Sequence, residues 1–462
     1  MFRNVATSLL RLISLVLLVV ACKNSVDTLP ISTGKAIESF TFDKLAPPVA
    51  GVVDSLIYTV RATVPVGTDL TRLIPNITVS SNATVSPSTA VAQNFTKPVS
   101  YTVTAMDNKT QAYVVSVSVA STIANGGSLV YMGTGSGNFF AIDAGTGAVK
   151  WRASTGASIT SSAFVAAGMA FTGSENGNIY AFDAELGKER WKFSTGKSML
   201  SSPIVSDRLV LAGSEDQTLY ALDVLTGNLR WKFGTAGGLT SSPVVADKVV
   251  YVGSKDQTLY ALDVLTGNQR WKFGAGGIIT SSPAVVGGLV YSGTNDYNLY
   301  ALNAVTGTIK WKFGTGGIIS SSPAVANGLV YVGSGDKNVY ALDAATGALK
   351  WKVSTGGQIS SSAAIANGVV YIGSEDKTLY ALDAVTGALK WKFGTGGIIS
   401  SSPVVYNGFV YFGGQDTSLY CLNATNGAVR WRLPMDARLL ASPCLANTNL
   451  VPFPAGISGG QQ

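Results

Sequence analysis

The chain of 462 residues contains no histidine and only three cysteines, Cys22, Cys421 and Cys444. The absence of histidine removes the most common general base and the most common transition-metal ligand of proteins. Only 13% of the residues are charged, and the repeated part of the chain shows no apolar period of 3.6 residues, which excludes amphipathic helices there. We therefore predict no catalytic residues and no metal site.

What the chain has in abundance is a repeat of forty residues, of which 321–360 is a clear copy. Glycines from Gly133 to Gly413 and serines from Ser162 to Ser442 recur at this interval. All eight tryptophans do so too, without insertion or deletion, at Trp151, Trp191, Trp231, Trp271, Trp311, Trp351, Trp391 and Trp431. The chain therefore contains eight copies of one structural unit.

Each unit predicts four short β-strands separated by turn residues. In one unit these are Pro323–Val325, Leu329–Gly333, Val339–Asp343 and Leu349–Val353. The first three are mostly apolar, which is typical of strands buried on both faces. The fourth alternates between apolar residues and lysines, as expected of an outer strand with one face in water.

Four antiparallel strands repeated eight times predict an all-β, eight-bladed propeller. The first unit lacks its opening strand, whereas the end of the chain supplies a spare copy at 441–445. We expect this copy to complete the first blade, which gives a closed propeller over 128–454 and a tail at 455–462. An open solenoid is the alternative, but it would need polar caps at both ends.

Residues 341–351 (ALDAATGALKW) resemble the tryptophan-docking motif of the eight-bladed propellers in pyrroloquinoline quinone (PQQ) dehydrogenases and in BamB-like lipoproteins. The motif recurs in all eight units, with Asn303 and Asn423 in place of its aspartate and Leu186 and Asn426 in place of its threonine. The resemblance implies that the eight tryptophans are structural and dock neighbouring blades together.

Residues 1–21 resemble a bacterial lipoprotein signal peptide, with an apolar run from Leu12 to Ala21 just before Cys22. A run of about ten residues is too short to span a bilayer core of roughly 30 Å. The resemblance implies that Cys22 is lipidated and begins a tether at 22–35. Lys23 after the cysteine implies the outer membrane, facing the periplasm or the cell surface.

Residues 36–120 have no tryptophan and are rich in valine, serine and threonine. Strands bounded by turn residues are predicted at Leu56–Val64, Ile77–Val79, Tyr101–Ala105 and Tyr113–Val119. We predict a small β-sandwich, which resembles the immunoglobulin-like domains that separate lipid anchor and main domain in bacterial lipoproteins. Residues 121–127 are the linker that follows it, and the role implied for the domain is spacing.

Aspartates recur in the loop between the second and third strands, at Asp216, Asp256, Asp296, Asp336, Asp376 and Asp416. A turn-forming role is the plain interpretation, and contact with a cation or a partner is the alternative. Loops after the second and fourth strands should emerge on the same side of the ring. The loops after the fourth strands carry Ile278, Ile279, Ile318, Ile319, Ile398 and Ile399. Because a mixed apolar and acidic surface suits a protein or peptide, both sets are candidate partner-binding residues.

The net charge of +7 does not indicate nucleic-acid binding, because sixteen of the 33 basic residues flank the tryptophans around the rim. Basic outer strands protect sheet edges from aggregation, and attraction to anionic lipids is the alternative.

The serine repeat should line the central channel. Because no histidine or lysine lies beside these serines to activate them, we do not expect them to act as nucleophiles. Cys421 and Cys444 are expected to be buried thiols, and a disulfide between them stays open.

We therefore expect a monomeric, lipid-anchored, non-enzymatic scaffold or docking protein of the cell envelope that binds a protein or peptide. The BamB-like resemblance implies a part in outer-membrane protein assembly. No cofactor is expected, because PQQ enzymes carry insertions, adjacent cysteines and calcium ligands, whereas every unit here has forty residues. A PQQ-dependent oxidoreductase with calcium and a surface glycan-binding protein are the alternatives.

Overall fold

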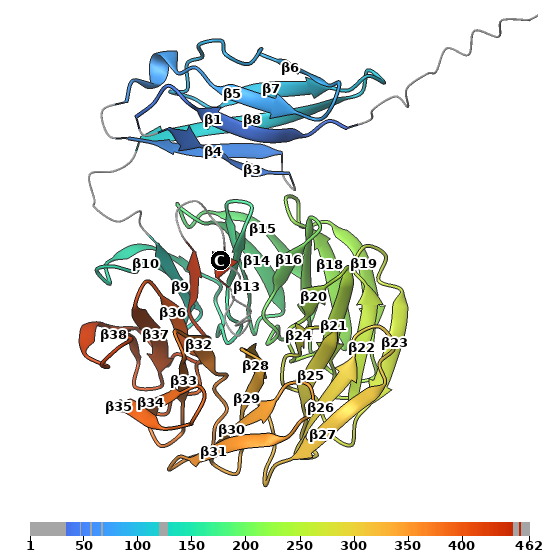
Figure 1. The fold of residues 1–462 in the computed structure, drawn as a ribbon, viewed down its shortest axis with the longest axis vertical. Coiled ribbons are helices and arrows are strands. Elements are labelled where there is room, and N and C mark those ends of the chain that lie inside the picture. Colours follow the sequence, from blue (N-terminus) through green and yellow to red (C-terminus); the bar gives the residue numbers. More distant parts are fainter. Residues whose placement is uncertain are drawn as a thin grey trace, which may run out of the picture.

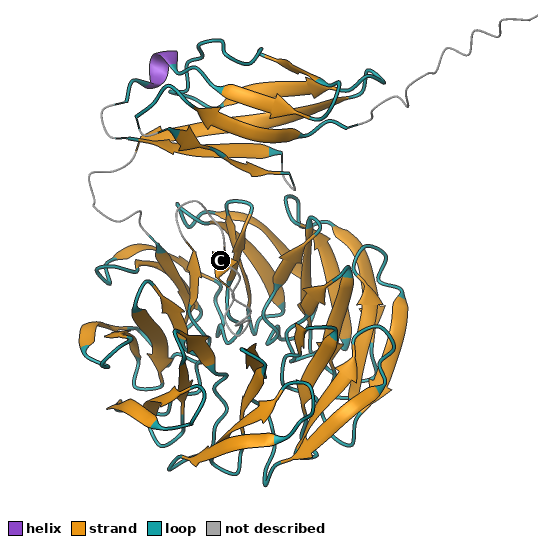
Figure 2. Ribbon diagram, viewed as in Figure 1, coloured by secondary structure: helices purple, strands orange, loops and turns teal. Residues whose placement is uncertain are grey.

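A computed structural model describes residues 34–46, 48–55, 58–65, 68–119, 128–446 and 452–453. The predicted signal peptide, Cys22 and the linker at 121–127 lie outside the described residues, as does the tail at 455–462. Within the described ranges, no helix has the length and apolar character needed to cross a membrane. The described chain folds into an N-terminal sandwich and a ring of β-sheets (Figures 1 and 2).

The N-terminal region is the predicted sandwich of two sheets. One sheet has the order β2 (Val49–Ala50), β1 (Ile37–Phe42), β5 (Asn76–Val79). The other has the order β3 (Val52–Asp54), β4 (Thr59–Val64), β8 (Thr110–Val119), β7 (Val99–Thr104), β6 (Thr84–Ser86), and the 3-10 helix η1 covers Leu70–Arg72. Phe40, Phe42, Phe95 and Tyr101 fill the space between the sheets. Four of these strands, β1, β2, β3 and β6, were not predicted. β2, β3 and β6 have only two or three residues, and β1 mixes apolar residues with Glu38, Ser39 and Thr41, which gives a weak sequence signal.

Residues 128–446 form the eight predicted blades, each a four-stranded antiparallel sheet. Blade 1 contains β9 (Leu129–Gly133), β10 (Asn138–Asp143), β11 (Val149–Ser154) and β40 (Cys444–Ala446), with β41 (Pro452–Phe453) paired to β40. Blade 2 contains β12 (Phe164–Ala166), β13 (Met169–Gly173), β14 (Asn178–Asp183) and β15 (Glu189–Ser194). Blade 3 contains β16 (Ile204–Ser206), β17 (Leu209–Gly213), β18 (Thr218–Asp223) and β19 (Leu229–Gly234). Blade 4 contains β20 (Val244–Ala246), β21 (Val249–Gly253), β22 (Thr258–Asp263) and β23 (Gln269–Gly274).

The remaining blades repeat this plan. Blade 5 contains β24 (Ala284–Val286), β25 (Leu289–Gly293), β26 (Asn298–Asn303) and β27 (Ile309–Gly314). Blade 6 contains β28 (Ala324–Ala326), β29 (Leu329–Gly333), β30 (Asn338–Asp343) and β31 (Leu349–Ser354). Blade 7 contains β32 (Ala364–Ala366), β33 (Val369–Gly373), β34 (Thr378–Asp383) and β35 (Leu389–Gly394). Blade 8 contains β36 (Val404–Tyr406), β37 (Phe409–Gly414), β38 (Ser418–Asn423) and β39 (Val429–Pro434).

The C-terminal strand closes the ring. β40 pairs antiparallel with β9, so that Cys444 faces Tyr131 and Leu445 faces Val130. The prediction that the last copy of the first strand completes blade 1 is therefore confirmed. Leu445 is fully buried, and the first and last blades share one hydrophobic core cluster.

The tryptophans join each blade to the next. The Trp311 indole Nε1 of blade 5 donates a hydrogen bond to the Ala344 carbonyl oxygen of blade 6 at 3.0 Å. The indole also lies on Gly347, where φ is +74° and an added Cβ would meet the ring at 2.7 Å. Trp431 makes the same bond from blade 8 to Ala144 of blade 1 at 3.1 Å. The motif is thus a repeated contact between blades that also closes the ring.

The glycine repeat marks a second close approach. A Cβ on Gly333 of β29 would lie 2.2 Å from the Cγ2 atom of Ile359, in the loop after the fourth strand of the same blade. Such a distance is far inside van der Waals contact, so a larger residue cannot fit without moving the loop. The glycines therefore let the loop after the fourth strand pack onto the second strand.

Candidate functional site

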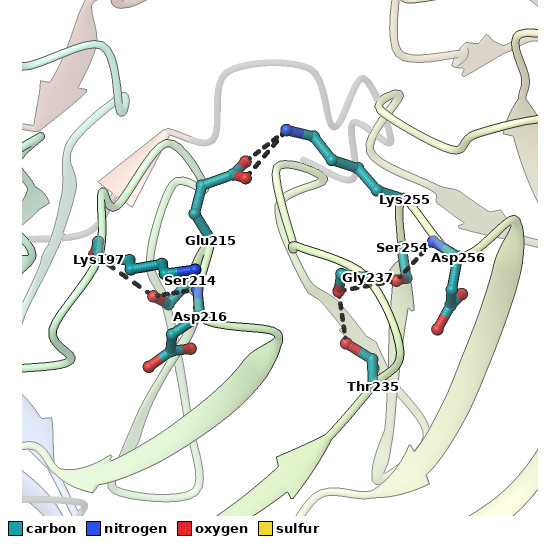
Figure 3. Close-up of polar contacts among 9 residues, drawn as sticks. All are labelled: Lys197, Ser214, Glu215, Asp216, Thr235, Gly237, Ser254, Lys255 and Asp256. Carbon is teal, nitrogen blue, oxygen red and sulfur yellow. Dashed lines mark hydrogen bonds and ion pairs between the residues drawn. The ribbon is translucent and has the colours of Figure 1, made fainter.

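The candidate site is the loop face, which we define as the loops after the second and fourth strands of every blade, residues 254–257 and 275–283 in blade 4 and their equivalents. The two kinds of loop lie together, as predicted. The Gly316 N–H after the fourth strand of blade 5 donates to Asp336 Oδ2 of blade 6 at 2.7 Å. Figure 3 shows the same meeting of loops between blades 3 and 4, where Ser254 Oγ of blade 4 donates to the Gly237 carbonyl oxygen after the fourth strand of blade 3 at 3.1 Å.

The repeated aspartates hold this face together. Asp336 Oδ1 accepts the Asn338 N–H at 3.0 Å, and Oδ2 accepts the Tyr340 hydroxyl at 2.5 Å. Burial acts to raise the pKa of Asp336, but the bonds from Tyr340, Gly316 and Asn338 outweigh it and hold that pKa below its usual value. Burial raises the pKa of Tyr340 to about 12, and its bond to Asp336 acts in the same direction. Phenol and carboxylate are therefore a fixed donor and acceptor at neutral pH.

The same tyrosine bond is made by every candidate aspartate. Each is half-buried and accepts the hydroxyl of the tyrosine four residues later, at Asp216, Asp256, Asp296, Asp336, Asp376 and Asp416. The turn-forming interpretation thus accounts for these carboxylates. Only their exposed edges are left for contact with a partner.

The candidate isoleucines divide into two groups. Ile278, Ile318 and Ile398 come first in each pair and are exposed or half-exposed, Ile318 at 38%. Ile279, Ile319 and Ile399 come second and are at most 1% exposed, since they pack against the glycine repeat. The structure corrects the prediction here, because the second isoleucine of each pair belongs to the core and not to a docking surface.

The sequence interpretation missed Tyr297, which follows Asp296 on the same face. It is 51% exposed and has a φ of +69°. The equivalent positions in the other blades carry no aromatic residue; they are Gly137, Gly177, Gln217, Gln257, Lys337, Lys377 and Thr417. Comparing the eight repeats position by position would have found it. Its carbonyl oxygen accepts the Thr315 N–H at 2.8 Å, so it adjoins the loop that carries Ile318.

The position before each aspartate also differs between blades. Blade 3 has Glu215 and blade 4 has Lys255, and the two side chains form an ion pair across neighbouring loops at 2.8 Å (Figure 3). Blade 5 has Asn295 here, and blade 6 has Gly335. A pair that is only partly buried, as this one is, contributes little to stability, at most about 1 kcal/mol. It does give one sector of the loop face a charge pattern that the other sectors lack.

The serine repeat lines the axis, as predicted, and it forms a ring that was not foreseen. The N–H of each serine donates to the hydroxyl oxygen of the equivalent serine in the next blade, for example Ser322 to Ser362 at 2.9 Å. The bond from Ser442 to Ser162 at 3.0 Å closes the circle. The ring borders an axial cavity of about 190 Å³. The serine hydroxyls therefore secure the inner strands. Phe164, Ile204 and Val244 also line the cavity, so its wall is uncharged and mostly apolar between the serines.

The basic residues of the rim and the two cysteines are the remaining features noted in the sequence. Basic residues that precede the tryptophans form ion pairs with the motif aspartate, for example Lys350 with Asp343 at 3.2 Å. Cys421 and Cys444 are unpaired and buried, and burial raises the pKa of both thiols to about 12. Neither is therefore a reactive thiolate at neutral pH. Among the described side chains, no three cysteine, aspartate or glutamate residues gather as a metal site would require.

Eight equal blades, tryptophans that bond to the next blade and a final strand that closes the first blade together define a propeller of PQQ-like repeats. The family model described as "Outer membrane protein assembly factor BamB" matches residues 141–242, 215–321 and 312–441. The chain belongs to this family. A second model, "SGBP, N-terminal", matches residues 37–117, the sandwich. No curated protein matches the sequence.

Solved structures of several kinds share the propeller fold. BamB from Moraxella catarrhalis is 18% identical with a TM-score of 0.56, over 63% of this chain and 94% of that one. A quinohemoprotein alcohol dehydrogenase from Pseudomonas putida is 16% identical with a TM-score of 0.53, over 61% and 68%. A europium-containing methanol dehydrogenase is 13% identical with a TM-score of 0.54, over 62% and 81%. At these identities the likeness establishes the fold alone.

Proposed function

We propose that the protein is a non-enzymatic docking protein of the cell envelope that binds a protein or peptide partner through its loop face. The observation that carries the proposal is the sector formed by Ile278, Tyr297 and Ile318. These side chains are exposed or half-exposed on consecutive loops, which are joined by bonds from Asn295 N–H to the Ile278 carbonyl and from Thr315 N–H to the Tyr297 carbonyl. Aromatic and aliphatic residues beside charged ones are typical of the centre and rim of protein interfaces.

The family supports a place in the envelope. BamB is described as an outer membrane protein assembly factor, and we extend that role to this chain as the leading version of the proposal. A lipid on Cys22 would hold the propeller at the outer membrane. No cofactor enters this function, so the absorption spectrum of the protein should not change on incubation with PQQ and calcium.

The partner is tested by crosslinking and affinity purification from the native envelope. Combined substitutions Tyr297→Ser and Ile318→Ser should reduce the recovered partner at least about tenfold, the effect of losing roughly 1.4 kcal/mol of binding. The matched control is Val305→Ser with Val385→Ser, two exposed residues after third strands, on the opposite face. If the control pair lowers capture and the loop-face pair does not, the partner binds the opposite face and the proposal is wrong.

The anchor is tested separately. Cys22→Ala should block lipidation and cleavage by the lipoprotein signal peptidase, so that the protein accumulates with its signal peptide and takes up no labelled fatty acid. Uptake of labelled fatty acid and a mass equal to that of the processed parent would contradict lipidation at this residue.

The match of the sandwich to the "SGBP, N-terminal" model favours a second candidate, a surface glycan-binding protein. Retention of the purified protein on immobilised polysaccharides, with no protein recovered by crosslinking, would support it over the docking role. Loss of retention on deleting residues 36–120 would assign the glycan contact to the sandwich, and loss with Tyr297→Ser would assign it to the propeller.

A further inference from the structure

The turns between the first and second strands share one backbone conformation, but two of them contain long side chains that do not favour it. In blades 2 to 8, each such turn has two residues with positive φ, for example Asn327 at +51° and Gly328 at +74°. Asparagine followed by glycine is the preferred pair for this turn. Blade 3 instead has Asp207 and Arg208, with Arg208 at +66°, and blade 4 has Asp247 and Lys248, with Lys248 at +61°. Long side chains at such φ values are disfavoured.

The strained Arg208 meets the sandwich. Its guanidinium carbon lies 5.1 Å from the ring centroid of Tyr58, within the range of a cation–π contact. Tyr58 itself has a φ of +55°, and its ring packs edge-on against the buried Tyr113 with centroids 5.5 Å apart. Two residues in disfavoured backbone conformations thus face each other across the two domains. Residues in such conformations persist where the surrounding structure holds them in place.

A second contact lies on the neighbouring blade. An added Cβ on Gly168, in the turn of blade 2, would be 2.2 Å from Nη2 of Arg61 in β4. Gly328 has the same φ of +74° in blade 6, and nothing lies within 4 Å of the equivalent point. The two glycines therefore have one backbone conformation and differ in the presence of the sandwich. In Figure 1 the sandwich lies beside the part of the ring that contains β13 to β16.

The turn of blade 3 is also braced. The Asp207 carboxylate accepts the Ser206 hydroxyl at 2.9 Å and forms an ion pair with Lys248 of the next blade. This arrangement restrains the turn that carries Arg208. The two non-glycine turns are therefore linked to each other, and one of them carries the guanidinium that contacts Tyr58.

We propose that the sandwich is docked in a fixed position on the first-to-second-strand turns of blades 2 and 3, with Arg208 and Gly168 as the residues that receive Tyr58 and Arg61. These turns lie on the face of the ring opposite to the loop face, because successive turns of an antiparallel blade alternate between faces. The sandwich is thus a positioning domain and not a flexible spacer. The sandwich leaves the loop face uncovered and fixes the orientation of the propeller relative to the N-terminal segment.

The experiment measures the distance between the domains in the full chain. Cys22→Ser removes the predicted lipid site, and Cys421 and Cys444 are buried, so nitroxide labels on Met106→Cys and Val305→Cys, both exposed, report one distance by electron–electron double resonance. Gly168→Asn and Gly328→Asn are the matched pair, since asparagine tolerates positive φ. We expect a narrow distribution for the parent and Gly328→Asn, and a modestly broadened or shifted one for Gly168→Asn, because the added side chain displaces the flexible guanidinium of Arg61 from this turn.

A second pair tests the arginine without a clash. Arg208→Gly should broaden the distribution without lowering the melting temperature, because glycine suits the turn. Tyr58→Leu should broaden it equally, and the double variant should be no broader than either. Lys248→Gly, which relieves the same turn strain but keeps the guanidinium, should change the distribution less than Arg208→Gly does. A broad distribution in the parent, or identical distributions for the parent, Gly168→Asn and Arg208→Gly, would overturn the proposal.

Discussion

Blades 1 and 6 build the same loop with different groups. In blade 6, Asp336 accepts the Tyr340 hydroxyl and the N–H of Gly316. Blade 1 has Ser136 in place of the aspartate, and it also has Phe140 in place of the tyrosine. The carboxylate and the hydroxyl are thus absent together. Losing the acceptor alone would leave a half-buried hydroxyl without a partner, which costs more than having no hydroxyl at all.

Blade 2 shows an intermediate solution. Asn176 replaces the aspartate, and its Nδ2 donates to the Tyr180 hydroxyl at 2.9 Å. The hydroxyl then donates to the Thr155 carbonyl oxygen at 3.2 Å. The direction of the bond is reversed and every group keeps a partner. The hydrogen bond to the tyrosine is therefore sufficient to explain why aspartate occurs at these positions of the loop face, and no ligand or partner is needed to account for it.

Blade 1 also differs in taking its innermost strand from the far end of the chain, and removing that strand gives the largest effect that we expect. Ending the chain after Met435 deletes β40 and breaks the serine ring at Ser442. We expect the unfolding free energy to fall by more than about 5 kcal/mol, because one buried leucine alone is worth roughly 2–5 kcal/mol. Deleting 455–462 should have little effect. Equal melting temperatures for the two truncations would contradict a closed ring.

The tryptophan contact should contribute equally to stability at the junction of blades 8 and 1 and at the other junctions between blades. Trp311→Ala and Trp431→Ala each remove an indole that bonds to the next blade. We expect each to lower the unfolding free energy by about 3–5 kcal/mol, measured by urea denaturation. A much smaller loss for Trp431→Ala would mean that the junction between blades 8 and 1 is held chiefly by β40.

The pairing rule for the loop face predicts a smaller effect with a characteristic rescue. Asp336→Ser leaves Tyr340 and Gly316 without their acceptor and should cost about 1–3 kcal/mol. Asp336→Ser with Tyr340→Phe copies blade 1 and should recover part of that loss. A double variant less stable than the single one, by urea denaturation, would show that the two groups are not a unit.

The smallest effect concerns pH and compares blades that have the motif aspartate with blades that have asparagine. The bond from Arg270 is the main cause that lowers the pKa of Asp263 from 3.8 to about 2, and the Thr386 N–H is the main cause that lowers the pKa of Asp383 from 3.8 to about 2. A folded-state pKa below the unfolded one stabilises the protein above about pH 4, and this stabilisation is lost as the pH falls towards 2.

Asparagine keeps the turn without that titration. Asn303 Oδ1 accepts the same two N–H groups, both at 2.9 Å. Asp263→Asn with Asp383→Asn should therefore fold and should show a shallower fall of the urea midpoint between pH 4 and 2. The same slope in the parent and the double variant would mean that other carboxylates govern the acid response.

Most of the fold could be predicted because it repeats. Eight tryptophans at one interval and a spare strand after the last of them specify blade number, strand order and closure. The sandwich was harder, since β1, β2, β3 and β6 each occur once and have no second copy to compare. The site was predicted in part. The loop face was identified, but Ile279, Ile319 and Ile399 were assigned to its surface because adjacent isoleucines in a loop look equivalent in sequence.

The sequence by itself determined the architecture, because strand period, turn residues and repeat length are local properties that act alike in every unit. Only the tertiary structure decided which groups remain free. Whether Asp336 is available depends on Tyr340 and on Gly316 of the preceding blade, and whether Arg208 is a turn residue or a docking residue depends on Tyr58, 150 positions earlier in the chain. Such contacts arise from packing between units and domains, so no pattern within one repeat can reveal them.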